Sequence, residues 1–123
     1  LVLRLSYDRT SFLLTSDIFI PAESFLVAQE ASLSATVLKV AHHGSRNASS
    51  AHFIERVAPV AAVISAGPEN AFGHPDQAVL RRLSGIVGEN RLFRTDKHGT
   101  VRFVTDGHTL WVETQEPRLA GLY

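Results

Sequence analysis

Two adjacent histidines follow an apolar segment of this sequence. Residues 37–41, Val-Leu-Lys-Val-Ala, have the composition of a buried strand, and residues 42–45, His-His-Gly-Ser, come directly after it. The carboxyl end of a strand in a rigid sheet holds side chains at fixed distances, and neutral imidazole is the commonest protein ligand for zinc and similar metals. The pattern therefore predicts a metal site that includes His42 or His43.

A second apolar segment, residues 11–15, ends two positions before Asp17. One carboxylate together with imidazoles suits zinc, manganese or iron in a hydrolytic site. A bridging carboxylate could serve two metal ions about 3.5–4 Å apart, which activate a water and clamp both oxygens of a displaced phosphate in nucleases. The alternative is structural: Asp17 would cap a helix that begins near Pro21, and the two histidines would only fill a loop.

The two histidines are expected to have different roles. Neighbouring side chains of an extended strand point to opposite sides, so at most one of His42 and His43 is expected to bind a metal directly. His42 shares a strand face with Leu38 and Val40, and it is slightly favoured as the ligand. The other histidine is then expected to pack beside the site or to hydrogen-bond there.

His74 is the second candidate for chemistry. It precedes Pro75, where a helix is expected to begin, and the N–H groups at a helix N-terminus bind phosphate readily. Its alternative role is that of a helix-capping residue. Ser45 and Arg46 follow the paired histidines and are candidates for contact with an anionic substrate. The remaining histidines have the pattern of surface or turn residues: His52, His98 and His108.

The composition limits the class of protein. With 123 residues the chain is expected to form a single domain or half-domain, and 12 basic against 12 acidic residues leave no overall charge to attract a polyanion such as DNA. No cysteine is present, so disulfides and thiolate metal ligands are excluded. No apolar run approaches the roughly 18 residues of a membrane span, so no direct membrane contact is expected. Because the chain has no methionine, we expect it to be a piece of a longer protein.

The hydrophobic pattern predicts an α/β fold with the element order ββαβαβαβββ. A helix at residues 21–31 is expected to bury a stripe that includes Phe25, Leu26 and Ala28. The other predicted elements are, in chain order, a hairpin at 1–15, a strand at 36–41, a helix at 49–58, a strand at 60–65, a helix at 75–88, a hairpin that joins 91–94 to 100–105 around a turn at 96–99, and a last strand at 109–113 after a turn at 106–107.

Five motifs follow one another along residues 1–105. They are Phe-Leu-Leu-Thr-Ser-Asp at 12–17, Val-Leu-Lys-Val-Ala-His-His-Gly-Ser at 37–45, Ala-Val-Ile-Ser-Ala-Gly at 62–67, Phe-Gly-His-Pro at 72–75 and Arg-Thr-Asp-Lys-His-Gly at 94–99. Their types and order resemble the metallo-β-lactamase superfamily, and specifically the C-terminal domain of ComEC-type DNA-uptake (competence) proteins, in which LLTGD, VLKVPHHGS, AVISVG, YGHP and RTDxxG occur in this order.

The resemblance implies the C-terminal half of a metallo-β-lactamase αββα sandwich with a binuclear site for zinc or manganese. Asp17 would bridge two metal ions, one of His42 and His43 would bind the second ion, and these residues together with His74 are the candidates for catalysis. The implied activity is that of a metal-dependent hydrolase, a nuclease that degrades the strand of incoming DNA that is not transported. The parent protein would lie at the cytoplasmic membrane, with this domain on its outer side.

Two departures from the family pattern bear on these expectations. Ser16 stands where the family has glycine, and the family's His-rich metal loop belongs to the N-terminal half of the domain and not to these residues. We therefore expect the chain to need that half as a partner, to be inactive alone, and to tend to form a homodimer through exposed strand edges. Two alternatives stay open: a non-catalytic interaction or scaffold module that keeps the fold, and a metallo-hydrolase of a small ester, lactam or thioester.

Overall fold

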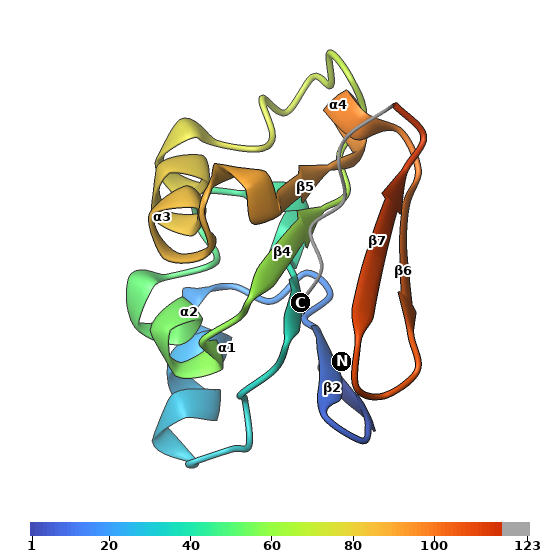
Figure 1. Cartoon of the computed structure of the whole chain (residues 1–123). Helices are drawn as coiled ribbons and strands as arrows, with labels where there is room; N and C mark the ends of the chain where they lie inside the picture. Colours follow the sequence, from blue (N-terminus) through green and yellow to red (C-terminus); the bar gives the residue numbers. More distant parts are fainter. Residues whose placement is uncertain (117–123) are drawn as a thin grey trace.

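The computed structural model of the chain describes residues 1–116. Figure 1 shows its layers: α1, α2 and α3 lie on one side of a central sheet, and a two-stranded hairpin lies on the other side. None of the helices in this part of the chain is long and apolar enough to cross a membrane. The strands are β1 (Leu3–Tyr7), β2 (Thr10–Leu14), β3 (Val37–Lys39), β4 (Ala61–Ile64), β5 (Leu92–Arg94), β6 (Val101–Thr105) and β7 (Leu110–Thr114). The helices are α1 (Ile20–Ala28), α2 (Ala51–Val57), α3 (Gln77–Val87) and α4 (Thr95–His98), with 3₁₀ turns η1 (Ala41–Gly44) and η2 (Glu89–Arg91).

The central sheet has the strand order β1-β2-β3-β4-β5, and β2 to β5 are parallel. β1 pairs antiparallel with β2 and forms the predicted N-terminal hairpin. The helices that connect the parallel strands cover one face with an apolar core that includes Leu38, Ile54, Ile64 and Leu83, each at most 1% exposed. The predicted α/β class is confirmed, and the strands and the three longer helices follow in the predicted order.

The hairpin of β6 and β7 covers the other face of the central sheet (Figure 1). A second, smaller core joins these two layers, in which Ala61 and Phe93 of the central sheet pack with Val112 of β7. Phe103 of β6 meets Phe93 edge-on at a centroid distance of 5.8 Å. The parallel strands are therefore covered on both faces, as their apolar character predicts.

The predicted pairing of residues 91–94 with 100–105 is wrong. β5 instead pairs in parallel with β4, and β6 pairs with β7 around the predicted turn at 106–107. The reason is local, because residues 95–98, predicted as part of a tight turn, form the one-turn helix α4. The chain thus leaves the central sheet before β6 begins.

The buried side of α1 agrees with the predicted stripe at Leu26, which packs against the core, and differs from it elsewhere. Phe25 is 62% exposed and Ala28 is exposed, whereas Glu23 is fully buried. The Glu23 carboxylate accepts hydrogen bonds from the backbone N–H groups of Ser49 and Ser50, at 2.9 Å for Ser50. A buried carboxylate is tolerated when charge-assisted hydrogen bonds satisfy it, and this one fastens the segment before α2 to α1.

Candidate functional site

The carboxyl ends of β2 and β3 bring Asp17 and His43 together. The two strands are parallel and in register, with Leu14 opposite Lys39, so the loops that follow them leave the sheet at one edge. The Asp17 Oδ1 atom lies 3.9 Å from His43 Nε2, and the two side chains are 67% and 53% exposed. The pair therefore lies at the surface, at the edge where the sequence predicts a site.

The backbone at the two histidines is not extended. The prediction that their side chains point to opposite sides assumed an extended strand, so it does not apply here. β3 ends at Lys39, and His42 and His43 have φ values of 48° and 57°, in the left-handed region. Consecutive left-handed residues turn the chain sharply. The two imidazole rings lie near each other at this edge, with a centroid distance of 6.2 Å.

Ser16 takes part in the same arrangement. Its φ is 53°, in the region that favours glycine, so the serine adopts the backbone conformation that the glycine of the resembling family would reach without strain. The Ser16 carbonyl accepts a hydrogen bond from the His42 N–H at 2.9 Å. This bond joins the loop after β2, which carries Asp17, to the loop after β3.

Gly44 lets the histidine loop pack against the segment before α3. Its φ is +82°, and a Cβ at this position would lie 2.5 Å from the Cβ of Pro75. The Asp76 N–H also donates to the Gly44 carbonyl at 2.9 Å. Only glycine allows this approach without displacement of its neighbour, so the loop with the paired histidines and the loop with His74 are held in contact.

A backbone carbonyl orients the His43 ring. The Nδ1 atom of His43 lies 2.8 Å from the carbonyl oxygen of Ser65. Because a carbonyl oxygen only accepts, Nδ1 carries the proton, and Nε2 of the neutral ring then holds the free lone pair. This Nε2 is the atom nearest Asp17, and metal-binding histidines commonly donate their other ring nitrogen to a carbonyl in this way.

His42 lies at the centre of a cluster of rings. Its ring centroid is 4.8 Å from that of Phe19 and 5.7 Å from that of His74. The Nδ1 atom of His42 is buried and has no hydrogen-bond partner among the described residues. A buried nitrogen without a partner costs about 1–3 kcal/mol. The structure thus brings four predicted residues to one edge of the sheet: Asp17, His42, His43 and His74.

The loop that carries His74 is fastened by the side chain of Asn70. Its Oδ1 accepts hydrogen bonds from the N–H groups of Phe72 and His74 at 3.2 and 3.1 Å, and its Nδ2 donates to the carbonyls of Gly67 and His74 at 2.9 and 2.6 Å. Together with His43, this loop lines a pocket of about 210 Å³. Sequence reasoning assigns no role to Asn70, although asparagine in a loop that begins Gly-Pro is a typical turn-forming residue.

The structural alternatives for Asp17 and His74 do not apply. The N-cap residue of α1 is Phe19, which makes no side-chain capping bond. α3 is capped by Asp76, whose Oδ1 accepts from the Ala78 N–H at 2.8 Å. Neither Asp17 nor His74 is therefore needed to begin a helix.

The two predicted substrate contacts in the histidine loop differ in accessibility. Ser45 is 3% exposed, and its hydroxyl accepts a hydrogen bond from the Asn47 N–H at 3.3 Å. Arg46 is exposed in the same loop. An anion in solution thus meets the Arg46 side chain more readily than the Ser45 hydroxyl.

Lys39, the last residue of β3, adds a positive charge near Asp17. Burial lowers the pKa of Lys39 below its usual value, and the Asp17 carboxylate acts in the opposite direction. The Lys39 Nζ atom donates to the Val40 carbonyl at 3.2 Å. A metal cation near Asp17 would therefore be repelled by the ammonium group of Lys39.

The donor types suit a divalent metal, but the described residues do not complete a site. The 3.9 Å between Asp17 Oδ1 and His43 Nε2 is within reach of two ligands of one ion, since each metal–ligand bond is about 2.1 Å. Within residues 1–116, however, no three histidine or carboxylate groups are placed to hold one metal ion. Because zinc sites use three or four protein ligands, the described residues supply only part of a metal site.

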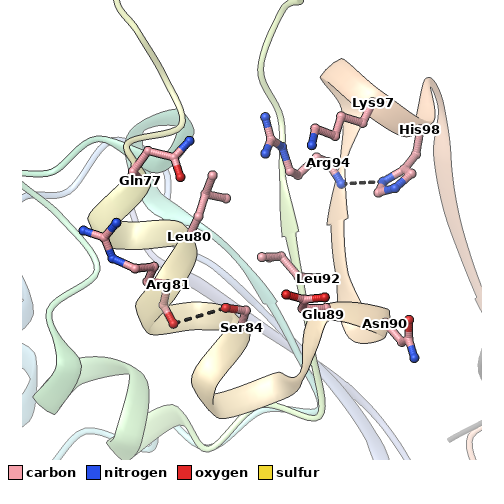
Figure 2. Close-up of a pocket in the computed structure, with 10 residues that line it drawn as sticks. All are labelled: Gln77, Leu80, Arg81, Ser84, Glu89, Asn90, Leu92, Arg94, Lys97 and His98. Atoms are coloured by element: carbon pink, nitrogen blue, oxygen red, sulfur yellow. Dashed lines mark hydrogen bonds between the residues drawn. The ribbon is translucent and has the colours of Figure 1, made fainter.

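A larger pocket, of about 470 Å³, contains none of the predicted site residues (Figure 2). It lies between α3 and the edge strand β5, and the side chains of Arg94 and Lys97 extend toward α3 across it. His98, which also lines it, accepts a hydrogen bond at Nδ1 from the Arg94 N–H at 2.9 Å and so holds α4 to β5. This pocket adds no residue to the candidate site.

The fold and the site together define the chain as an α/β domain with imidazoles and a carboxylate gathered at the carboxyl edge of its parallel strands. No family model matches the chain, and no solved structure matches it significantly. The chain is 37% identical over 103 residues to ComE operon protein 3 of Bacillus subtilis (strain 168), a match of 84% of this chain and 13% of that protein. It is 38% identical over 105 residues to Competence protein ComA of Neisseria gonorrhoeae, a match of 83% of this chain and 15% of that protein.

A third relative, Uncharacterized protein YcaI of Escherichia coli (strain K12), is 38% identical over 82 residues, a match of 66% of this chain and 11% of that protein. The first two relatives support a competence and DNA-uptake protein family for this chain, in agreement with the resemblance of its motifs. The chain spans 13% and 15% of these two proteins, so what they do as a whole is not assigned to it directly. The resemblance to the metallo-β-lactamase superfamily stays a prediction.

Proposed function

We propose that this chain is part of a metal-dependent phosphodiesterase of the metallo-β-lactamase fold that acts on DNA during its uptake. The similarity to ComE operon protein 3 and to Competence protein ComA supports the role in uptake. The observation that carries the proposal of a hydrolytic site is the Asp17–His43 pair at the carboxyl edge of the parallel strands, with the His43 ring oriented by the Ser65 carbonyl.

The cofactor would be a divalent metal, zinc or manganese, with two ions in the complete domain. It would supply an activated water for attack on a phosphodiester. Asp17 and one histidine of this chain would be among its ligands. The oriented Nε2 atom of His43 favours this residue over His42, which sequence reasoning slightly favours. The remaining ligands would come from the N-terminal half that the family resemblance implies, so we expect the chain alone to be inactive.

The chain's other candidate residues would bind the substrate. Arg46 is exposed beside the histidines and would contact a phosphate, because a guanidinium pairs well with phosphate oxygens. His74 lines the pocket next to His43 and would contact the substrate there. Ser45, which is buried, would shape the loop rather than touch the DNA.

The edge strand β1 would be the surface that a partner covers. Its side chains Leu3, Leu5 and Tyr7 are 43%, 49% and 61% exposed. Exposed apolar edge strands tend to pair with another chain, which here would be the N-terminal half of the domain or a second copy of this chain. Following the resemblance, we place the domain on the outer side of the cytoplasmic membrane.

Calorimetric titration of Zn²⁺ and Mn²⁺ into the longer protein that includes the N-terminal half, and into its variants, tests the proposed site. Asp17→Ala and His43→Ala are each expected to weaken metal binding by roughly tenfold or more. Asp8 and His108 form a matched control, because their side chains are also exposed and lie 3.2 Å apart. We expect Asp8→Ala and His108→Ala to leave the affinity unchanged, and equal losses at both pairs would contradict the assignment.

The activity is tested in the longer protein that includes the N-terminal half. That protein is expected to hydrolyse DNA in the presence of Zn²⁺ or Mn²⁺, and Asp17→Asn is expected to abolish hydrolysis while the protein stays folded by circular dichroism. A metal-loaded wild-type protein that leaves both single-stranded and duplex DNA intact would refute the proposal.

A non-catalytic interaction module is the second candidate function. It is supported by Ser16, which stands where the resembling family has glycine, and by the position of the family's metal-binding loop outside these residues. This candidate predicts that the longer protein hydrolyses neither DNA nor small esters, lactams and thioesters when metal is added. Hydrolysis of a small ester without hydrolysis of DNA would point instead to a metallo-hydrolase of small substrates.

A further inference from the structure

Phe72 is an exposed aromatic side chain beside the candidate site. It is 81% exposed, compared with 62% for Phe25 and 61% for Tyr7. Exposure alone carries no meaning, because single apolar side chains are common on protein surfaces. The surroundings of Phe72 distinguish it from the other two residues.

The backbone that carries Phe72 is held in place on both sides. The Asn70 Oδ1 atom accepts from the Phe72 N–H at 3.2 Å and from the His74 N–H at 3.1 Å. The Asn70 Nδ2 atom closes the same loop through the carbonyls of Gly67 and His74. A ring on such a loop is presented in one place, so little conformational entropy is lost when a ligand binds to it.

Phe72 stacks on His74 and lines the pocket next to the paired residues. The two ring planes are 20° apart, with a centroid distance of 6.0 Å. Both rings line the pocket of about 210 Å³, and His43 lines it as well. Among the described residues that form this pocket there is no Lys, Arg, Asp or Glu side chain. The pocket therefore offers flat rings and apolar surface beside the Asp17–His43 pair.

We infer that Phe72 binds a nucleobase of single-stranded DNA by stacking, so that residues 67–74 form a base-binding subsite. This inference rests on the proposed function, since DNA is the proposed substrate. Aromatic rings stack on bases of any sequence, and a pocket without charged side chains fits a base better than a phosphate. In duplex DNA each base is stacked between its neighbours, so a single strand or an unpaired end is the form that fits.

Fluorescence anisotropy of the full chain with two labelled oligonucleotides of equal length and charge tests the inference. One is oligo(dT), and the other is its abasic counterpart. Phe72→Ala is expected to weaken binding of oligo(dT) about tenfold, or about 1.4 kcal/mol, which is the size of one base–aromatic stack. Phe72→Tyr is expected to retain the affinity, and binding of the abasic strand is expected to be the same for all variants.

Phe25→Ala is the matched control, because it removes another exposed phenylalanine, on α1, which contributes no residue to the pocket lined by Phe72 and His74. Its affinity for both oligonucleotides is expected to equal that of the wild type. Circular dichroism and thermal unfolding should be unchanged in the Phe72 variants, since Asn70 bonds to the backbone of the loop and not to this ring.

Different failures are distinguishable in this experiment. If Phe72→Leu binds oligo(dT) as the wild type does, or if the wild type binds both oligonucleotides equally, the base-stacking inference is overturned and DNA remains the proposed substrate. If the wild type binds neither oligonucleotide, the inference falls together with the DNA substrate. Arg46→Ala reports on the proposed phosphate contact independently, because it should weaken binding of both oligonucleotides by the same factor.

Discussion

Two aspartate–histidine pairs lie at opposite ends of β2. The carboxylate of Asp8 lies 3.2 Å from Nε2 of His108, and the carboxylate of Asp17 lies 3.9 Å from Nε2 of His43. Their exposures are alike: 59% and 52% for His108 and Asp8, and 53% and 67% for His43 and Asp17. Residue type and exposure therefore do not separate a site from a surface ion pair.

The surroundings of the two pairs do separate them. Asp8 and His108 join two turns that already hold each other, because the Arg9 N–H donates to the Gly107 carbonyl at 2.8 Å. This contact links the hairpin of β1 and β2 to that of β6 and β7, so the pair has a structural explanation.

The loops that carry Asp17 and His43 are also joined by a backbone bond, from the His42 N–H to the Ser16 carbonyl, so the distinguishing feature of the Asp17–His43 pair is its side-chain geometry. Its 3.9 Å separation is longer than a hydrogen bond, and the His43 ring is held by the Ser65 carbonyl rather than by Asp17. Two further imidazoles, those of His42 and His74, lie at the same edge. The comparison teaches that convergence of oriented side chains on one edge of the sheet, and not the pair by itself, indicates a site.

The largest loss of stability is expected from Gly44→Ala, which would disturb the edge of the sheet at which Asp17 and His43 lie. The new Cβ would lie 2.5 Å from the Cβ of Pro75, at a φ of +82°. Overpacking together with left-handed strain is expected to lower the free energy of unfolding by roughly 2–4 kcal/mol, measured by urea denaturation.

Gly85→Ala is the matched control for Gly44→Ala. Gly85 lies inside α3, and a Cβ there meets no atom of the described residues within 4 Å. Alanine has the higher helix propensity, so this substitution is expected to raise the free energy of unfolding by about 0.5–1 kcal/mol. Similar effects of the two substitutions would contradict the close packing of the histidine loop against Pro75.

The second-largest loss of stability is expected from Glu23→Ala. This substitution removes hydrogen bonds from the segment after the histidine loop and leaves the turn with Asp8 unchanged. The buried N–H groups of Ser49 and Ser50 would lose their acceptor. We expect a loss of about 2–3 kcal/mol in the free energy of unfolding. Glu55→Ala on the exposed side of α2 is the control and should change it by less than about 0.5 kcal/mol. Equal effects would show that the Glu23 carboxylate is not required for the fold.

Much of the framework of this site could be predicted from the sequence. Apolar segments bounded by Pro and Gly indicate the order of strands and helices, and parallel strands place their carboxyl ends at one edge. Asp17 and the paired histidines were therefore expected to meet, and the 3.9 Å separation of Asp17 and His43 agrees with this. The pairing of β5 was not predictable by this reasoning, because a three-residue strand has almost no periodicity to distinguish its partner.

The orientation of the histidines could not be predicted. Their left-handed backbone depends on contacts with residues remote in the sequence, such as that of Gly44 with Pro75 and that of the His42 N–H with Ser16. The Ser65 carbonyl that orients His43 comes from the end of the neighbouring strand β4. Local sequence patterns do not specify contacts between residues that are remote in the sequence. Only the structure therefore favours His43 over His42.

A third charged pair is a reference for the contribution of the two aspartate–histidine pairs to stability. Arg94 donates to the Asp96 carboxylate at 3.0 and 2.5 Å, and the two side chains are only 17% and 13% exposed. The Arg94 guanidinium lowers the pKa of Asp96 below its usual value, so the unfolded chain binds this proton more readily. The stabilisation is therefore present above about pH 4 and is lost as the pH falls through the lowered pKa.

We expect Asp96→Asn to lower the free energy of unfolding by about 1 kcal/mol at neutral pH. The difference from the wild type should shrink at acidic pH, where Asp96 itself becomes protonated. Denaturation curves at about pH 7 and about pH 3 measure this change. A difference that stays constant over this range would contradict the assigned pair with Arg94.

The smallest effects are expected at the two aspartate–histidine pairs themselves, and they test the comparison directly. Without metal, Asp8→Ala should lower the free energy of unfolding by about 0.5 kcal/mol, because exposed ion pairs contribute little to stability. Asp17→Ala should change it less, because the Asp17 carboxylate is 67% exposed and lies 3.9 Å from the nearest imidazole nitrogen.

Added Zn²⁺ or Mn²⁺ should reverse the order of the two variants. A ligand that binds only the folded protein raises its melting temperature, so in the longer protein that includes the N-terminal half, metal should stabilise the wild type and Asp8→Ala but not Asp17→Ala. Thermal unfolding with and without metal measures both quantities in one experiment. If metal raises the melting temperatures of both variants equally, the two pairs are equivalent in solution. The convergence of imidazoles at the carboxyl edge would then not be evidence for a site.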